Sequence, residues 1–182
     1  MKKIKLSSRK AIIEAAFQTY SQRPGASLGD IAEYAGVGRA TLHRHFSSRK
    51  ELMAALAKTA IEELNECVEA ATIGAQSHTE GLKLALAAII PLANRQWFLS
   101  HEPVDDNQEI VAIYEAHIAE LHSEIEAARA EGTFAPDLST RWISEVYENL
   151  IYTAWTMVRE DEATSSQAAE IVWRIFMKGA SK

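Results

Sequence analysis

The chain has 182 residues, of which 47% are hydrophobic and 24% charged, a composition typical of a globular protein with enough length for a sizeable core. No run approaches the ~18 apolar residues of a membrane span and no apolar stretch follows the lysine-rich start, which argues against a membrane protein or a signal peptide and predicts a cytoplasmic location. Cys67 is the single cysteine, which excludes an intrachain disulfide and predicts a buried thiol.

The formal net charge of −6 is distributed unevenly along the chain. Residues 1–50 hold ten Lys or Arg against three Asp or Glu, a net charge of +7, so the remaining residues together carry −13. A basic end on an acidic body suggests that this end meets a polyanion. A solvated basic surface would explain the charge alone equally well.

Apolar residues recur at helical spacing along the whole chain and nowhere alternate as in a strand, so the sequence predicts an all-α fold of about nine helices. The first helix carries an apolar face between Ile12 and Tyr20. The loop 21–26, which contains a proline and a glycine, is expected to end it.

Two short helices around a tight turn are predicted next. Ser27 is a good N-cap for the second helix, and Asp30 is placed as the acidic partner in a capping box. Gly36 allows the left-handed backbone that a sharp turn needs, and a third helix follows over about 39–46. This is the helix-turn-helix arrangement, in which the second of the two helices enters the major groove of DNA.

The rest of the chain is predicted to form longer helices. They are expected over about 49–71, 79–99 with a kink or boundary at Pro91, 106–130, 139–159 and 165–177. We therefore predict an N-terminal three-helix DNA-binding domain, residues 1–50, and a larger helical body, residues 51–182.

The third helix offers side chains that suit a base edge. Leu42 and Phe46 are expected to face the domain core, which turns its other side chains outward. An arginine can donate two hydrogen bonds to guanine, and residues at helix starts are placed for phosphates. The candidate DNA contacts are Ser27, Arg39, Ala40, Thr41, His43, Arg44, Arg49 and Lys50. The alternative is a buried helical hairpin without a DNA role.

A combined pattern of residues supports the DNA-binding interpretation: Arg9, Ile12, Ala15, Ala16, Phe17, Ser27, 30–32, 35–37, 41–42, 45–46, Arg49 and Leu52. With this pattern, residues 8–55 resemble the DNA-binding domain of TetR-family transcriptional regulators. The resemblance implies an all-helical second domain that binds a ligand and dimerises. Gly38 stands where the family often has a capping serine, and His43 where a tyrosine usually holds a phosphate.

The resemblance also implies that the last two helices pair with those of a second subunit. Both carry apolar stripes, part of which is expected to be intrachain core; the candidate interface residues are Ile143, Val146, Tyr147, Leu150, Ala154, Ile171 and Ile175. A two-fold homodimer places two recognition helices about 34 Å apart and so predicts an inverted-repeat operator.

Aromatic residues and histidines in the body are candidates for a ligand pocket, since such pockets are mostly apolar with a few placed polar groups. They are Trp97, Phe98, His101, Tyr114, His117 and Tyr152. His117 shares a helical face with Tyr114 and is expected to point inward. A satisfied place in the core is the alternative for each of them.

No cofactor, metal site or catalytic activity is expected. His117 and His122 are five residues apart, off the spacing that puts two imidazoles on one helical face, and no nucleophile motif or phosphate-binding glycine loop is present. The sequence therefore predicts a ligand-responsive DNA-binding repressor whose partners are double-stranded DNA, an unknown small-molecule effector and a second copy of the chain, with no membrane. The alternative is a DNA-bound adaptor whose body recognises a protein.

Overall fold

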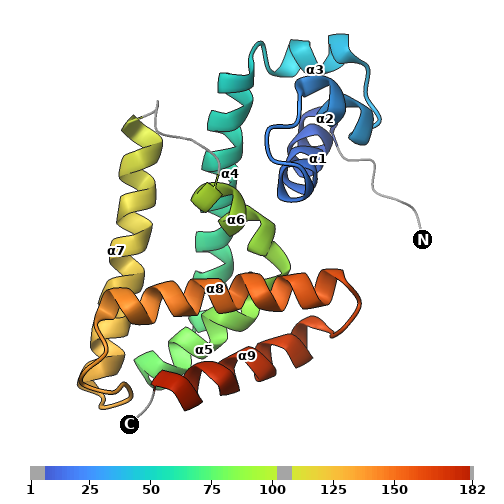
Figure 1. Ribbon diagram of the computed structural model, residues 1–182. Coiled ribbons are helices and arrows are strands. Elements are labelled where there is room, and N and C mark those ends of the chain that lie inside the picture. Colours follow the sequence, from blue (N-terminus) through green and yellow to red (C-terminus); the bar gives the residue numbers. More distant parts are fainter. Residues whose placement is uncertain (1–6, 102–107, 181–182) are drawn as a thin grey trace. The chain divides into compact units, whose positions relative to one another are not determined.

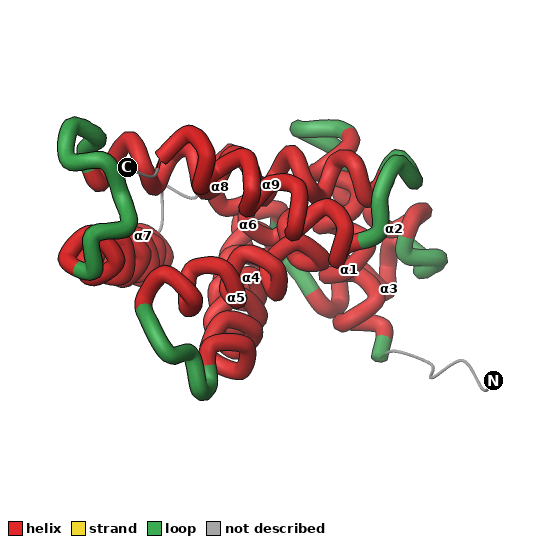
Figure 2. Tube along the Cα trace, turned by 90° about the horizontal axis from the view of Figure 1, so that it is seen from below, coloured by secondary structure: helices red, strands yellow, loops and turns green. Residues whose placement is uncertain are grey.

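The computed structural model describes residues 7–101 and 108–180, apart from the side chains at 100, 109, 110, 113 and 114. These residues form nine α-helices and one short 3-10 helix, without a β-strand among them (Figures 1 and 2). The all-α fold predicted from the helical spacing is confirmed. The helices gather into two compact units, one of Met1–Ala60 with Asn94–Val111 and one of Ile61–Ala93 with Ala112–Lys182.

The first unit contains the three N-terminal helices, half of a fourth and a helix from later in the chain. They are α1 (Ser8–Gln22), α2 (Leu28–Tyr34), α3 (Arg39–His45), the first half of α4 (Arg49–Thr72) and α6 (Ala93–His101). Its core consists of fully buried apolar side chains from each of these helices: Ile12, Phe17, Tyr20, Ile31, Leu42, Phe46, Leu52, Leu56 and Phe98.

Local signals in the sequence explain where the short helices begin and end. The Ser27 hydroxyl accepts from the Asp30 backbone N–H at 3.2 Å, and the Asp30 carboxylate accepts from the Ser27 N–H at 2.8 Å, which completes the predicted capping box. Gly36 has φ +66°, as the predicted left-handed turn requires. The first helix runs to Gln22, further than predicted, because Ser21 is buried and continues the helical face.

Two aromatic contacts and an ion pair hold α6 against α1. The Phe98 ring packs edge-on against Phe17, with ring centroids 5.6 Å apart, and lies 6.0 Å from the Tyr20 ring. Arg95 donates to the Glu14 carboxylate at 2.5 Å, and its guanidinium lies 4.5 Å from the centre of the Phe17 ring. The α6 helix is therefore part of the core of the first unit.

The second unit contains the end of α4, then α5 (His78–Ile89), the 3-10 helix η1 (Ile90–Leu92), α7 (Gln108–Ala130), α8 (Thr140–Arg159) and α9 (Ser165–Ala180). The predicted boundary at Pro91 is confirmed, since this proline lies in η1 between two α-helices. The last helix is three residues longer than predicted. Cys67 is half-buried rather than buried, and its thiol donates to the Ala88 carbonyl at 3.1 Å.

The α8 and α9 helices pack along each other and share an aromatic core (Figure 1). The rings of Phe134, Tyr147 and Trp173 surround Phe176, each with its centroid 5.6–5.7 Å from that ring. The buried Tyr147 hydroxyl donates to the Leu82 carbonyl at 2.6 Å, and burial raises the pKa of the phenol.

A carboxylate from the end of α7 satisfies the first turn of α5. Glu131 accepts from the backbone N–H groups of His78 and Thr79 at 2.8 and 3.1 Å, and from the Thr79 hydroxyl at 2.9 Å. These bonds lower the pKa of Glu131. The His78 Nδ1 lies 2.9 Å from the Glu124 carboxylate, which raises the pKa of the imidazole.

Within the described part of the chain, no helix combines the length and the apolar content that crossing a bilayer requires.

Candidate nucleic-acid interface

The outer face of α3 is polar and largely exposed. Leu42 is fully buried and Phe46 nearly so, which fixes the rotation of the helix on the core. The four side chains Arg39, Ala40, His43 and Arg44 are exposed, and Thr41 is half-buried. The orientation predicted from the spacing of Leu42 and Phe46 is therefore found in the structure.

The acidic side chains of this region are held in contacts of their own. Arg23 binds the Asp30 carboxylate at 2.7 Å, and the Ser27 hydroxyl donates to the same carboxylate at 2.7 Å. These bonds, that of Ser27 first, lower the pKa of Asp30. Glu51 accepts from the Ser47 N–H and hydroxyl, both at 2.7 Å, which lowers the pKa of that carboxyl. Two carboxylates of this region, those of Asp30 and Glu51, thus have partners outside α3.

The two basic candidates at the start of α4 differ in their surroundings. Arg49 is half-buried: its Nη1 donates to the Ala26 carbonyl at 2.6 Å, and its guanidinium lies 5.0 Å from the centre of the Tyr20 ring. Lys50 is exposed. Arg49 therefore ties the loop before α2 to α4, a structural role that its position in the sequence did not reveal.

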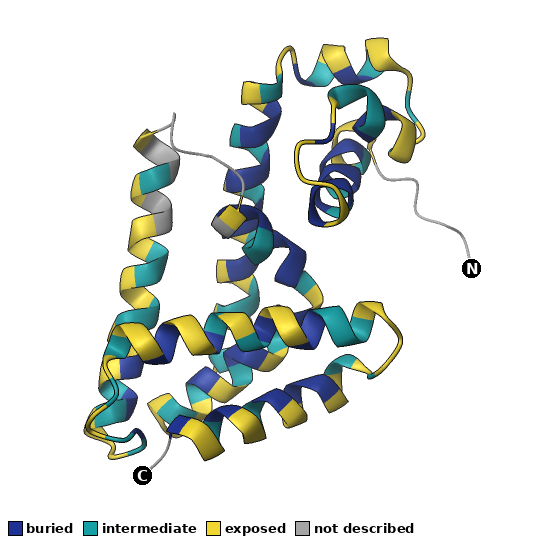
Figure 3. Ribbon diagram, in the orientation of Figure 1, coloured by how far each residue is buried: buried dark blue, intermediate teal, exposed yellow. Residues whose placement is uncertain are grey.

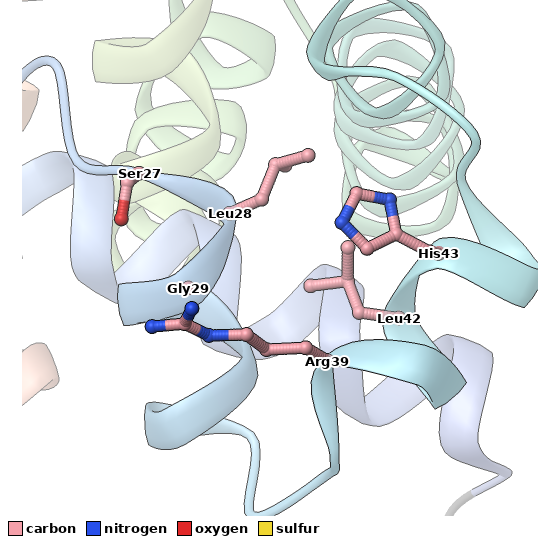
Figure 4. A pocket seen from close by; sticks show the side chains of 6 residues that line it. All are labelled: Ser27, Leu28, Gly29, Arg39, Leu42 and His43. Atoms are coloured by element: carbon pink, nitrogen blue, oxygen red, sulfur yellow. The ribbon is translucent and has the colours of Figure 1, made fainter.

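A depression of about 300 Å³ lies between the start of α2 and the outer face of α3, lined by Ser27, Leu28, Gly29, Arg39, Leu42 and His43 (Figure 4). Arg39 reaches from α3 toward α2, and its guanidinium lies beside Gly29 (Figure 4). Three of the predicted DNA contacts, Ser27, Arg39 and His43, are thus brought together from two helices. Sequence reasoning missed Gly29, since nothing local marks it as special.

The two departures from the TetR-like pattern are also visible. Gly38 is the N-cap of α3 and, having no side chain, makes no capping hydrogen bond. His43 is exposed on the α3 side of the depression, where its imidazole can donate a hydrogen bond.

Comparison with known proteins places this geometry in a family. The chain is 27% identical over 154 residues to the transcriptional repressor LfrR of Mycolicibacterium smegmatis, covering 84% of this chain and 80% of LfrR. It is 28% identical to the transcriptional regulator NfxB of Pseudomonas aeruginosa, covering 97% of this chain and 96% of NfxB. Residues 12–56 match the family model of the bacterial regulatory proteins of the tetR family. Residues 12–56 are thus a DNA-binding domain of the TetR type.

Solved structures of TetR-type regulators have the same fold. The structure of LfrR in complex with proflavine has a TM-score of 0.70 at 25% identity, covering 94% of this chain and 96% of that one. The structure of AibR in complex with isovaleryl coenzyme A and operator DNA has a TM-score of 0.73 at 17% identity, covering 93% and 97%, and supports the fold alone. With a DNA-binding domain of this type, the protein is a DNA-binding transcriptional regulator, and its curated relatives are regulators and not enzymes.

The predicted pocket residues of this regulator are divided between the two units. In the first unit, Phe98 is fully buried in the core, while the rings of Trp97 and His101 stack at 4.7 Å. In the second unit, His117 is half-buried and Tyr152 exposed, with the Tyr152 ring 5.7 Å from Trp155. The side chain of Tyr114 lies outside the described residues.

His117 has a polar partner and a lowered pKa. Its Nδ1 lies 3.2 Å from the Asn65 side-chain oxygen, a contact that suits the tautomer with the proton on Nδ1 and the acceptor on Nε2. Desolvation lowers the pKa of His117, which keeps the ring neutral at pH 7.

The predicted interface residues divide between the core and the surface. Ile143, Tyr147 and Ala154 of α8 are buried within the chain, as expected for part of that stripe, and Leu150 is half-buried. Val146, Ile171 and Ile175 are exposed at 36%, 43% and 53%, and Trp142 at 65%. Exposed positions recur along both α8 and α9 (Figure 3). Trp142 lies four residues before Val146, a spacing that places both residues on the same helical face. Trp142 was not among the predicted interface residues. Among the described residues, no group of three metal-ligating side chains forms a metal site.

Proposed function

We propose that this regulator is a homodimeric repressor that binds an inverted-repeat operator through residues 1–50 and is released when a small molecule binds in residues 51–182. The exposed basic face of α3 on a folded helix-turn-helix carries the proposal. DNA is a polyanion, and a basic helix face of this kind binds in its major groove. The proposal places the protein in the cytoplasm, where its DNA partner lies.

Each candidate contact has a proposed role. Arg39, Thr41 and Arg44 meet base edges, and the small Ala40 lets the backbone approach the groove. Phosphate oxygens are held by Ser27, His43, Arg49 and Lys50. For Ser27 this role requires its hydroxyl proton to turn from the Asp30 carboxylate to the phosphate. For Arg49 this role comes in addition to its bond with Ala26.

The exposed apolar face of α8 and α9 supports a dimer. We define the α8–α9 stripe as Trp142, Val146, Ile171 and Ile175, all of them large and exposed in the single chain. Large apolar side chains gathered on one face mark an association surface. A second copy placed on the stripe through a two-fold axis would present two α3 helices to successive turns of DNA.

His117 is the proposed polar contact of the effector. Its neutral Nε2 offers an acceptor to a ligand donor, as a pocket with few placed polar groups requires. A ligand that binds more tightly to the operator-incompatible arrangement of the dimer would shift the population away from DNA. LfrR and AibR have been crystallised with proflavine and with isovaleryl coenzyme A, so their effectors differ in chemistry.

An adaptor that binds a protein through its body is the second candidate. Two of the large side chains, Phe98 and Tyr147, are buried and fill the interiors of their units. This favours the adaptor, because these side chains occupy space that a ligand would need.

The test begins with the selection of duplexes from a random-sequence library, followed by footprinting of the best one. Two protected half-sites in inverted repeat are expected, and failure to select any duplex would overturn the proposal. Arg39→Ala is expected to weaken binding chiefly at one base pair, and Lys50→Ala to weaken it across sequences. A screen of small molecules for release of the selected duplex then separates the repressor, which at least one compound releases, from the adaptor.

A further inference from the structure

We infer that Gly29 is a positioning residue for Arg39. Because Gly29 has no side chain, the Arg39 guanidinium can lie close beside this position of α2 (Figure 4). The inference rests on the proposed function, in which Arg39 reads a base pair. It adds a residue from α2 to the recognition of that base pair, although Gly29 itself has no side chain to contact DNA.

The contact involves the whole planar end of Arg39. A Cβ atom placed on Gly29 would lie 3.2 Å from Nη2 of Arg39 and 3.4 Å from both Cζ and Nε. Because the three atoms are almost equally distant, the guanidinium as a group occupies the space beside Gly29, and not only its tip. A methyl group there would meet the guanidinium closer than most Cβ contacts, so the guanidinium would have to shift from its place beside Gly29.

The backbone offers no other reason for a glycine at this position. Gly29 is the second residue of α2 and does not have a positive φ, unlike Gly25 and Gly36. A glycine inside a helix is less favourable than an alanine, because it loses more backbone freedom on folding. The close approach of Arg39 is the feature of the structure that explains the glycine.

Three further residues line the depression. Leu28 comes from α2, and Leu42 and His43 from α3 (Figure 4). Fixing a long, flexible side chain on binding carries an entropic cost, which is smaller when the side chain is already placed. A guanidinium held in one orientation also presents its two N–H donors in one geometry. Bidentate recognition of guanine requires such a fixed geometry.

Gly29→Ala tests the inference, with Gly81→Ala as the matched control. Gly81 also lies in a helix without a positive φ, and a Cβ there would meet nothing within 4 Å. Affinity is measured for the selected duplex and for duplexes with single base-pair changes, at several salt concentrations. Gly29→Ala is expected to reduce the discrimination at the Arg39 base pair about threefold to tenfold, a part of what one bidentate contact supplies. Its salt dependence and thermal midpoint should match those of Gly81→Ala, which should keep full discrimination.

The double variant Gly29→Ala/Arg39→Ala decides whether the effect acts through Arg39. If it does, Gly29→Ala changes nothing further once Arg39 is removed. The same loss in both backgrounds, or full discrimination by Gly29→Ala alone, would overturn the inference. If Arg39→Ala itself leaves recognition unchanged, the base-reading role proposed for Arg39 fails instead, so the two failures are distinguishable.

Discussion

The outer faces of α3 and of the α8–α9 pair differ in the chemistry that they leave on the surface. On α3 two apolar residues, Leu42 and Phe46, are buried and arginines point outward, while nearby carboxylates are held by Ser27, Arg23 and Ser47. On α8 and α9, aromatic residues fill the core and a stripe of further apolar side chains is left exposed. A charged face that folding leaves unneutralised suits a polyanion, whereas an apolar face suits a second protein surface. The following predictions test this contrast.

The largest effect is expected from Phe98→Ala. Phe98 is fully buried against Phe17 and Tyr20, so its truncation should leave a cavity and reduce the free energy of unfolding by about 3–5 kcal/mol. Chemical denaturation measures the loss. The neighbouring Trp97 is only half-buried, and Trp97→Ala should cost less. Equal losses would contradict the placement of Phe98 in the core.

Ile175→Asp is expected to break the dimer without unfolding the chain. Ile175 is 53% exposed in the single chain, so the charge is costly only where a second copy covers it. Loss of bivalent binding should weaken operator affinity by about a hundredfold or more. Light scattering gives the mass and fluorescence anisotropy the affinity.

Ser166→Asp places the same charge on an exposed residue of α9 outside the stripe and should remain dimeric. A dimeric Ile175→Asp with full affinity would show that the stripe is not the interface.

Two neighbouring basic residues should respond differently to truncation. Lys50→Ala should leave stability unchanged and reduce the slope of log affinity against log salt by about 0.9, the effect of one phosphate contact. Arg49→Ala should also lower the free energy of unfolding by about 1–3 kcal/mol, because the Ala26 carbonyl loses its charged donor. Thermal melts and salt titrations separate the two effects, and equal melting temperatures would argue against the structural role of Arg49.

The smallest effect is a pH dependence of stability at His78. Glu124, and more weakly Glu131, raise the pKa of this imidazole, so its contribution is present below the unfolded pKa of about 6.5 and is lost as the pH rises through the higher folded value. The difference in melting temperature between the wild type and His78→Gln should therefore shrink from about pH 5.5 to about pH 8. A difference that grows over this range would reverse the assigned sign.

Sequence reasoning was most successful where the signals are local. The capping box of Ser27 and Asp30, the turn at Gly36 and the boundary at Pro91 each depend on residues a few positions apart. The rotation of α3 followed from the spacing of Leu42 and Phe46.

Contacts between distant residues could not be predicted in this way. Glu14 and Arg95 are 81 positions apart and Glu131 caps a helix 53 positions earlier, so neither pair leaves a local pattern. For the same reason the spacing of Tyr147 in its stripe could not distinguish a surface residue from one bonded to Leu82. The place of Arg39 beside Gly29 likewise depends on how α2 and α3 meet.

The attachment of α6 to α1 has a consequence for protein engineering. The first unit is discontinuous in sequence, since Asn94–Val111 folds with Met1–Ala60. A chimera that joins residues 1–50 to a foreign sensor would uncover the surfaces of Phe17 and Tyr20 that Phe98 covers, and would leave Glu14 without Arg95. An exchange of DNA-binding domains between such regulators would therefore have to transfer α6 together with the N-terminal helices. This requires a second junction in the chimeric sequence.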